Sequence, residues 1–448
     1  MNRKSKLILL ICIFALIGNI LSINPLVEGV CEIEPIRIAF IDTGISTKHI
    51  DTNKVEIGKN YIFEDQDTKD RIGHGTATAG MVLGSKKLGI EGSCPDALVV
   101  PLVTYDRYVS GVSKVGDISM MSQAIYDAVD IYNCRVINIS MGVSTESEEL
   151  HLALLYAEEK GAVVVSAVGN DNLTYPDRKY YPAIYNTVLG VGAAENLQED
   201  FAVADFSQQN GVSVLAKGAN LETISHRNDT KPIIRSGTSY ACAYVSGLCA
   251  QLLIDSPSLT PAQVRAILYA SAQDLGILGV DLESGWGIVG IDRSNSESVT
   301  RGMLASLLYT YDGEPESENS SFKDVLPDSY YNKAIGWAAD NGIVLGYSNS
   351  KFGPDDNITK EQLTVILHRY AKLKNYDVSL GEDTNILSYK DVKEVSEYAI
   401  SSMQWACGIN LFQDKDGKLL PQDKISKEEI VDIFLQFSRN TYLSQPLP

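Results

Sequence analysis

The segment SGTSYACAYVSG, residues 236–247, is the part of the sequence that most narrowly limits the fold. Its Ser239 follows Gly237 and Thr238 and stands at the predicted start of a helix, where the helix dipole favours developing negative charge. Small residues then give this helix a slim surface: Ala241, Ala243, Ser246, Gly247 and Ala250. We therefore expect the helix to pack deep against a sheet, although a serine at a helix start is often only a cap.

Two earlier segments hold other reactive side chains. In IDTGIS, residues 41–46, Asp42 follows an apolar strand, and a carboxylate at a strand end can orient a histidine. In GHGTATAG, residues 73–80, His74 stands between two glycines that allow close approach to the imidazole. Each motif alone is ambiguous, because Asp-Thr-Gly also occurs in aspartic proteases and in simple turns, and a lone histidine is more often structural.

Short apolar runs alternate with helical patterns from Ile36 to Ile291, which is typical of a parallel sheet covered by helices on both faces. The clearest predicted strands lie within residues 36–44, 136–142, 162–170 and 187–193. Met120 to Asn133 and Glu146 to Lys160 carry apolar residues at helical spacing. The pattern predicts an α/β fold.

The three segments, in the order Asp, His, Ser, resemble the triad blocks of the subtilisin family, and the resemblance extends over roughly residues 36–291. It implies that His74 takes the proton of Ser239 as the serine attacks a peptide carbonyl, that Asp42 fixes the histidine tautomer, and that an acyl-enzyme forms. A fourth block, SAVGN, ends in Asn170, which matches the asparagine of the family's oxyanion hole.

The resemblance also implies two walls of a substrate groove. One wall consists of Ser140, Met141 and Gly142, and the other consists of Ala167, Val168 and Gly169. The chain departs from the family with Tyr240 to Tyr244 after the nucleophile, and with Ala77 and Thr78 where the family has His and Val. No catalytic group is lost, so the resemblance still implies a serine-type endopeptidase, but substrate preference cannot be carried over.

Neither a metal site nor a required cofactor is predicted. Structural calcium, which many family members bind, stays an open alternative, because no loop with dense Asp and Asn ligands can be assigned to it. The cysteines show no CxxC or zinc-type spacing, and Cys242 and Cys249 lie seven apart on an apolar helical stretch, so we expect both in the core. A disulfide framework is not expected.

The amino terminus is typical of a secretory signal peptide, which we assign to residues 1–29. Basic residues precede an apolar run from Leu7 to Leu21, and Ser22 competes with Gly29 as the cut site. An uncleaved anchor is the alternative. Asp42 follows this segment too closely for a propeptide, so the domain, residues 30–291, folds unaided or with another factor, or has lost proteolysis.

The net charge of −19 argues against nucleic acid or an anionic membrane as a partner, because both would repel such a surface. We expect no second stretch that spans a membrane.

After a predicted linker, residues 292–298, the chain repeats itself. ITKEQLTVILHRY from residue 358 recurs as ISKEEIVDIFLQF from 425, and VTRGMLASLLYTY from 299 is a third copy. The units span residues 299–314 (truncated), 321–374 and 388–440. Thr300, Thr359 and Ser426 fit helix caps, and Gln362 and Glu429 complete capping boxes.

These units resemble S-layer-homology repeats, which implies a smaller all-α helical bundle that binds secondary cell-wall polysaccharide. By this resemblance Arg301, Lys360 and Lys427 meet the anionic glycan, with Trp337 and Trp405 nearby. The alternative is that the basic residues are ordinary first-turn side chains and that the tryptophans anchor the core.

The sequence thus favours a secreted serine endopeptidase held at a bacterial cell surface, in the cell wall or S-layer, and acting on exported proteins or peptides. Two alternatives remain: a catalytically inactive surface protein that uses the protease fold for binding, and a wall-binding protein in which proteolysis is incidental.

Overall fold

The structure is a computed structural model that describes residues 34–443 apart from 64, 66, 108–112, 198–199, 228, 292–296, 348–349, 380–383 and 413–415. The predicted signal peptide and most of the predicted linker lie outside the described residues. Residues 35–448 form one compact unit. Within the described ranges, every helix is too short or too polar to cross a membrane.

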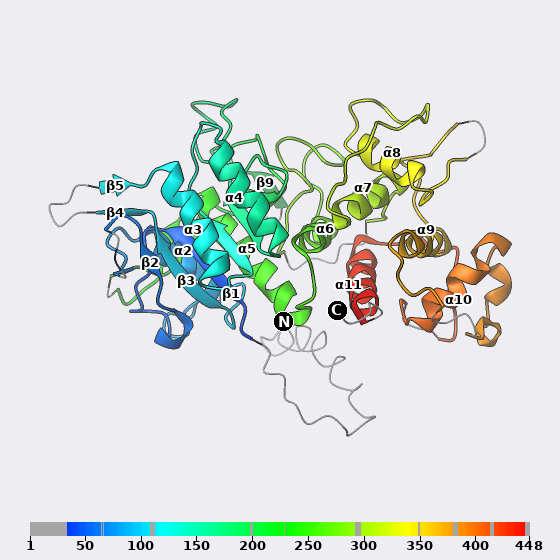
Figure 1. The fold of residues 1–448 in the computed structure, drawn as a ribbon, viewed down its shortest axis with the longest axis horizontal. Helices are drawn as coiled ribbons and strands as arrows, with labels where there is room; N and C mark the ends of the chain where they lie inside the picture. Colours follow the sequence, from blue (N-terminus) through cyan, green and yellow to red (C-terminus); the bar gives the residue numbers. More distant parts are fainter. Residues whose placement is uncertain are drawn as a thin grey trace, which may run out of the picture. The chain divides into compact units, whose positions relative to one another are not determined.

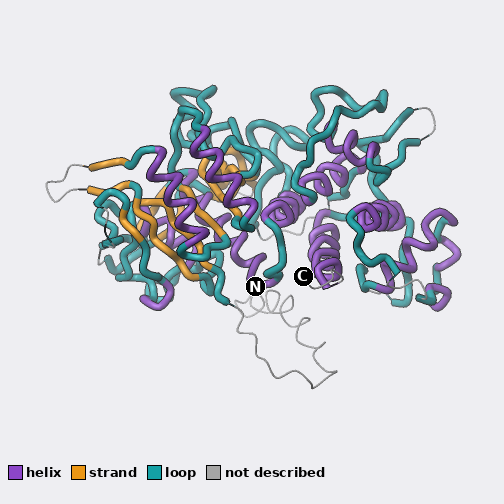
Figure 2. The backbone as a smooth tube through the Cα atoms, in the orientation of Figure 1, coloured by secondary structure: helices purple, strands orange, loops and turns teal. Residues whose placement is uncertain are grey.

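The amino-terminal half is built on one sheet whose main strands are parallel (Figure 2). Across the sheet the strands are β10 (Val214–Lys217), β8 (Val188–Leu197), β7 (Val163–Ala167), β6 (Val136–Ile139), β1 (Arg37–Asp42), β3 (Leu98–Val103) and β2 (Lys59–Asn60). A further strand, β9 (Asp200–Val203), pairs antiparallel with β8. Because both faces are covered, the strands are apolar at nearly every position.

Helices cover the two faces of this sheet (Figure 1). On one face, Ile38 and Phe40 of β1 pack in a cluster with α2 (His74–Leu83) and α5 (Thr238–Asp255). On the other, Ala39 and Ile41 pack with α3 (Ile118–Asp130) and α4 (Glu148–Glu159). The predicted parallel sheet with helices on both faces is confirmed.

The segment that contains Ser239 forms α5, which contacts β6, β7, β8 and β10. Its small residues are fully buried, as the slim helix surface predicted. Cys242 and Cys249 are also fully buried and unpaired, which confirms their assignment to the core. Smaller elements complete this half: β4 (Tyr105–Arg107) paired with β5 (Ser113–Val115), β11 (Leu221–Thr223) paired with β12 (Ile233–Arg235), η1 (Thr52–Lys54) and α6 (Pro261–Ser271).

The carboxy-terminal half is helical in the described ranges. Its helices are α7 (Arg301–Tyr311), α8 (Asn332–Asp340), α9 (Lys360–Leu373), α10 (Ile400–Gly408) and α11 (Lys427–Leu443), with short 3₁₀ turns η2 (Ile386–Ser388), η3 (Val392–Glu394) and η4 (Glu397–Ala399). Thr300 caps α7, and Thr359 with Gln362 and Ser426 with Glu429 form reciprocal hydrogen bonds. The predicted caps are confirmed.

A ring of three hydrogen bonds relates the three repeat units. The amide of Val299 donates to the carbonyl of Ile425 over 2.8 Å, that of Ile358 donates to Val299 over 2.9 Å, and that of Ile425 donates to Ile358 over 3.2 Å. All three side chains are buried. The truncated first unit therefore occupies a place equivalent to those of the two longer ones.

Helix α6 of the amino-terminal half packs within this bundle. Helix α8 of the second unit packs against α7 of the first, and α10 of the third unit packs against α9 of the second. In the same way α6 packs against α11 of the third unit, and it also contacts α7. The sequences of α6 and α8 are also alike, AILYAS at 266–271 and AIGWAA at 334–339, and both aromatic residues are buried. One apolar cluster includes α5, α6 and the helical units. Helix α6 thus stands where the truncated unit lacks a helix.

Candidate active site

The start of α2 brings His74 against the end of β1. Gly73, at the cap position, has φ of 105°, a left-handed conformation that favours glycine. A Cβ on Gly75 would collide with the carbonyl oxygen of Gly44 and lie 3.2 Å from Oδ1 of Asp42. The two glycines that flank the histidine thus allow the helix to begin beside the strand end.

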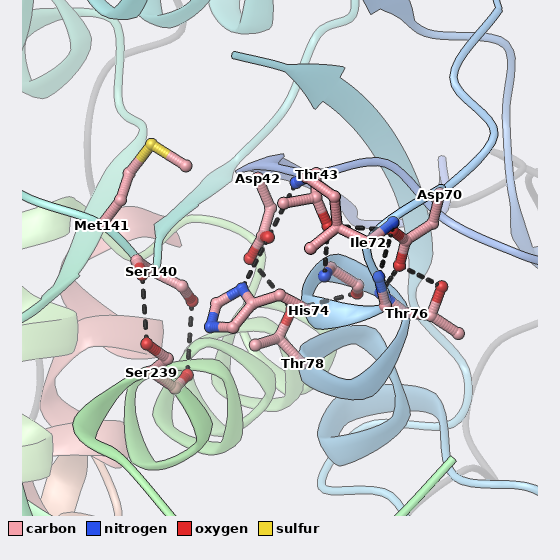
Figure 3. A network of polar contacts seen from close by, with 12 residues as sticks. Asp42, Thr43, Asp70, Ile72, His74, Thr76, Thr78, Ser140, Met141 and Ser239 are labelled. Atoms are coloured by element: carbon pink, nitrogen blue, oxygen red, sulfur yellow. Dashed lines mark hydrogen bonds and ion pairs between the residues drawn. The ribbon is translucent and has the colours of Figure 1, made fainter. Parts of the chain in front are cut away.

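Asp42 and His74 are directly hydrogen-bonded (Figure 3). Nδ1 of His74 lies 2.7 Å from Oδ1 of Asp42, which is fully buried. The amide of Thr43 donates to the same oxygen over 2.7 Å, and the hydroxyl of Thr78 donates to the other oxygen, Oδ2, over 3.2 Å. This buried carboxylate can hold one tautomer of the imidazole and stabilise its protonated form.

The same contacts set the basicity of His74. Burial alone lowers the pKa of the imidazole, but the charge and hydrogen bond of Asp42, together with the charge of Asp70, outweigh burial and raise the pKa above 6.5. The histidine is therefore a stronger base than an ordinary imidazole.

Asp70 fixes the backbone around the pair. Its Oδ1 accepts from the hydroxyl of Thr43 over 3.0 Å and from the amide of Gly73 over 2.6 Å, and its Oδ2 accepts from the amide and hydroxyl of Thr76 over 2.9 and 2.6 Å. The hydroxyl of Thr43 in turn accepts from the amide of Gly75 over 2.8 Å. Asp70 was not among the predicted site residues, because these contacts join segments that the sequence does not show to be adjacent.

Ser239 lies in the first turn of α5, on the side of His74 toward which the outer ring nitrogen points (Figure 3). Its hydroxyl donates to the carbonyl of Ser140 over 3.1 Å, while the hydroxyl of Ser140 donates to the carbonyl of Ser239 over 3.3 Å. To give its proton to His74, the hydroxyl of Ser239 would have to leave the carbonyl of Ser140. The ring of Tyr240 packs beside His74, with ring centroids 5.8 Å apart.

Asn170 follows β7 and is oriented by α5. Its side-chain oxygen accepts from the amide of Thr238 over 2.8 Å, so its NH₂ group is the end that can donate. The site for a Cβ on Gly237 lies 3.5 Å from that nitrogen, which places the NH₂ group at the start of α5. The residue is exposed and can meet a bound molecule.

The two predicted substrate walls follow neighbouring parallel strands. Ser140 to Gly142 follow β6, and the next residue, Val143, forms a two-way backbone pair with Tyr181, over 2.9 and 2.8 Å. Ala167 ends β7, Val168 is buried, and Gly169 has φ of 109°. The structure thus brings all of these residues to the carboxyl edge of the sheet, where Asp42 also lies.

The comparison with protein families identifies this arrangement. Residues 34–287 match the model of the Subtilase family. The chain belongs to the subtilase family. This subtilase is 32% identical to fervidolysin of Fervidobacterium pennivorans over 283 residues, covering 57% of the chain and 40% of fervidolysin. It is 31% identical to Subtilisin Savinase of Lederbergia lenta over 268 residues, covering 59% of the chain and 91% of Savinase.

The fold agrees with solved structures. The crystal structure of fervidolysin, described as a keratinolytic enzyme related to subtilisin, superposes with a TM-score of 0.52 at 30% identity, over 57% of the chain and 42% of fervidolysin. The predicted subtilisin-like α/β fold is confirmed. The chain matches 40% of the length of fervidolysin and so corresponds to less than half of that protein.

Two further segments, residues 321–364 and 388–431, match the S-layer homology domain. The predicted glycan contacts are buried in this structure. Arg301 donates to the carbonyls of Phe352 and Leu345 over 3.0 and 3.1 Å, Lys360 lies over the ring of Phe412, and Lys427 is 2% exposed. Trp337 and Trp405 are likewise buried, which agrees with their alternative assignment as core residues.

Lys427 shows what the burial means for glycan binding. Its ammonium donates to the carbonyl of Ala272 over 3.2 Å and pairs with Glu297 over 2.8 Å. A glycan could reach Lys427 only if this packing opened. The structure therefore gives Lys427 a structural role and provides no support for direct glycan contact there.

Proposed function

We propose that this subtilase is a serine endopeptidase in which Ser239 is the nucleophile, His74 the general base and Asp42 the residue that orients the base. The observation that carries the proposal is the 2.7 Å bond between His74 and a fully buried Asp42, with Ser239 on the other side of the imidazole. A buried carboxylate in this position stabilises the imidazolium that forms when the serine loses its proton.

The reaction proceeds through an acyl-enzyme. His74 accepts the hydroxyl proton as Ser239 attacks the peptide carbonyl, and then gives the proton to the leaving amine. The negative charge on the carbonyl oxygen is stabilised by the NH₂ group of Asn170 and the amide of Ser239 at the start of α5. Water, activated by His74, then releases the acyl group. The sequence requires no cofactor.

An extended substrate would lie between Ser140–Gly142 and Ala167–Gly169. Main-chain pairing along such a groove gives affinity with little sequence selectivity. The substrates that we propose are exported proteins or peptides.

The decisive experiment is labelling of the purified protein with a fluorophosphonate probe. We expect the wild type to be labelled and Ser239→Ala and His74→Ala to remain unlabelled, with and without a chelator. A folded wild type that takes up no probe, with or without added calcium, would favour the alternative, a surface protein that binds through a protease fold.

We further propose that the protein acts at a bacterial cell surface, where the S-layer homology region binds secondary cell-wall polysaccharide. The two family matches and the closed ring of three units support this proposal. The full-length protein should sediment with purified cell walls and should stay in solution with walls stripped of their secondary polymer. Equal sedimentation with both preparations would refute polymer binding.

A further inference from the structure

The ring of Tyr180 lies between the two walls of the proposed substrate groove. A Cβ built on Gly169 would lie 2.6 Å from Cδ2 of this ring, and a Cβ built on Gly142 would lie 3.5 Å from Cδ1. The two edges of one aromatic ring thus face the two glycines. A side chain that entered between the glycines would meet this ring.

The ring is held at both ends. Its hydroxyl donates to Oδ2 of Asp171 over 2.8 Å, and a guanidinium nitrogen of Arg178 donates to the same carboxylate oxygen over 2.7 Å and to the hydroxyl over 3.3 Å. At the backbone end, the next residue, Tyr181, is paired with Val143 in both directions. Moving the ring aside would break these contacts.

The charges near the ring are paired with each other. Asp171 is bound by Arg178, whose guanidinium also lies 3.6 Å from the centre of the Tyr175 ring. The other oxygen of Asp171, Oδ1, has no hydrogen-bond partner in the part of the chain that the structure describes, but it is buried, so it presents no open charge to the groove. The surroundings of Tyr180 therefore give no electrostatic preference for a basic or an acidic substrate side chain.

We propose that Tyr180 fills the pocket for the side chain immediately before the scissile bond and limits it to a small, uncharged residue: Gly, Ala or Ser. This inference rests on the proposed peptidase function and deepens it, because it names the class of peptide bond that is cleaved. The selection is steric, since a larger side chain would have to displace a clamped ring.

The test compares tetrapeptide anilides that differ only in the residue before the cleaved bond, Ala or Phe. We expect the wild type to cleave the Ala substrate with a kcat/KM at least tenfold higher than the Phe substrate, the size of effect that a misfit of a few carbon atoms produces. A wild type that prefers Phe would overturn the inference, and this result needs no variant to fold.

The variant Tyr180→Ala should raise kcat/KM for the Phe substrate and reverse the order of the two substrates. Tyr180→Phe, which keeps the ring without its hydroxyl, should still prefer Ala. An unchanged ratio in Tyr180→Ala that still takes up the fluorophosphonate would also overturn the inference. If the wild type takes up no probe, the peptidase function itself has failed.

Discussion

Thr78 offers a test of how the catalytic carboxylate is held, because its hydroxyl is the donor found for Oδ2 of Asp42, at 3.2 Å. Thr43 and His74 both bind the other oxygen, Oδ1. Replacement by valine, Thr78→Val, keeps the shape of the side chain and removes the hydroxyl with its contacts to Asp42 and to the carbonyl of Gly75. Oδ2 would then be a buried charged acceptor without this partner.

The expected loss follows from the geometry. A hydrogen bond to a charged group is worth about 1.5 to 3 kcal/mol. The bond here is long at 3.2 Å, and its single hydrogen is shared with the carbonyl of Gly75 at 3.0 Å, so we take the lower end of that range. A loss of about 1.4 kcal/mol of transition-state stabilisation corresponds to a roughly tenfold fall in kcat/KM.

The assay is kcat/KM for a peptide anilide from pH 5 to 10, with Thr78→Ser as the matched control that restores the hydroxyl. We expect the valine variant to be about tenfold slower at high pH. The rise of kcat/KM at the acidic end of the pH profile should also move to higher pH in the valine variant, because a carboxylate with one donor fewer attracts the imidazolium more strongly. If the valine and serine variants both match the wild type, Thr78 does not hold Asp42 and the reasoning is wrong.

Three further predictions concern other contacts. The pKa of His74 is raised above 6.5 and the neutral imidazole is the base, so kcat/KM should rise as pH passes through that higher pKa. The stability that charged His74 contributes is present below pH 6.5 and is lost as pH rises through the same pKa. Activity and thermal stability should therefore change in opposite directions with pH, and parallel curves would contradict the assignment. Asn170→Asp keeps an acceptor for the amide of Thr238 but loses the NH₂ donor, so kcat should fall by roughly 10²- to 10³-fold with folding retained; a kcat within threefold of the wild type would exclude Asn170 from the oxyanion site. Lys427→Met should lower the free energy of unfolding by about 1 to 3 kcal/mol in urea melts, because the bond to the carbonyl of Ala272 and the ion pair with Glu297 are both lost, while exposed Lys424→Met should have no effect; equal stability of the two variants would refute the structural role.

Much of the candidate site could be proposed from sequence because each of its reactive residues stands at a local signal. Asp42 ends an apolar strand, His74 lies between glycines, and Ser239 opens a helix of small residues. The caps at Thr359 and Ser426 were predictable for the same reason, since a capping box lies within four residues.

The remaining site residues depend on contacts that no local pattern encodes. Thr78 could be recognised as a departure from the family, but its bond to Asp42 crosses 36 positions of the chain. Tyr180 meets Gly142 and Gly169 only after two loops have folded together. A basic residue in the first turn of a helix predicted a ligand at Lys427, yet the partner is the carbonyl of Ala272, which lies 155 positions away.

The packing of α6 also bears on how the S-layer homology region could be transferred to another protein. Residue 292, where the predicted linker begins, would be the natural place to divide the chain. A division there would separate α11 from α6, leave the Lys427 ammonium without the Ala272 carbonyl, and expose the apolar flank of α6 to water. A transplanted S-layer homology region would therefore have to carry residues 261–272 with it. An amino-terminal half without that region would need new polar side chains on this helix to stay soluble.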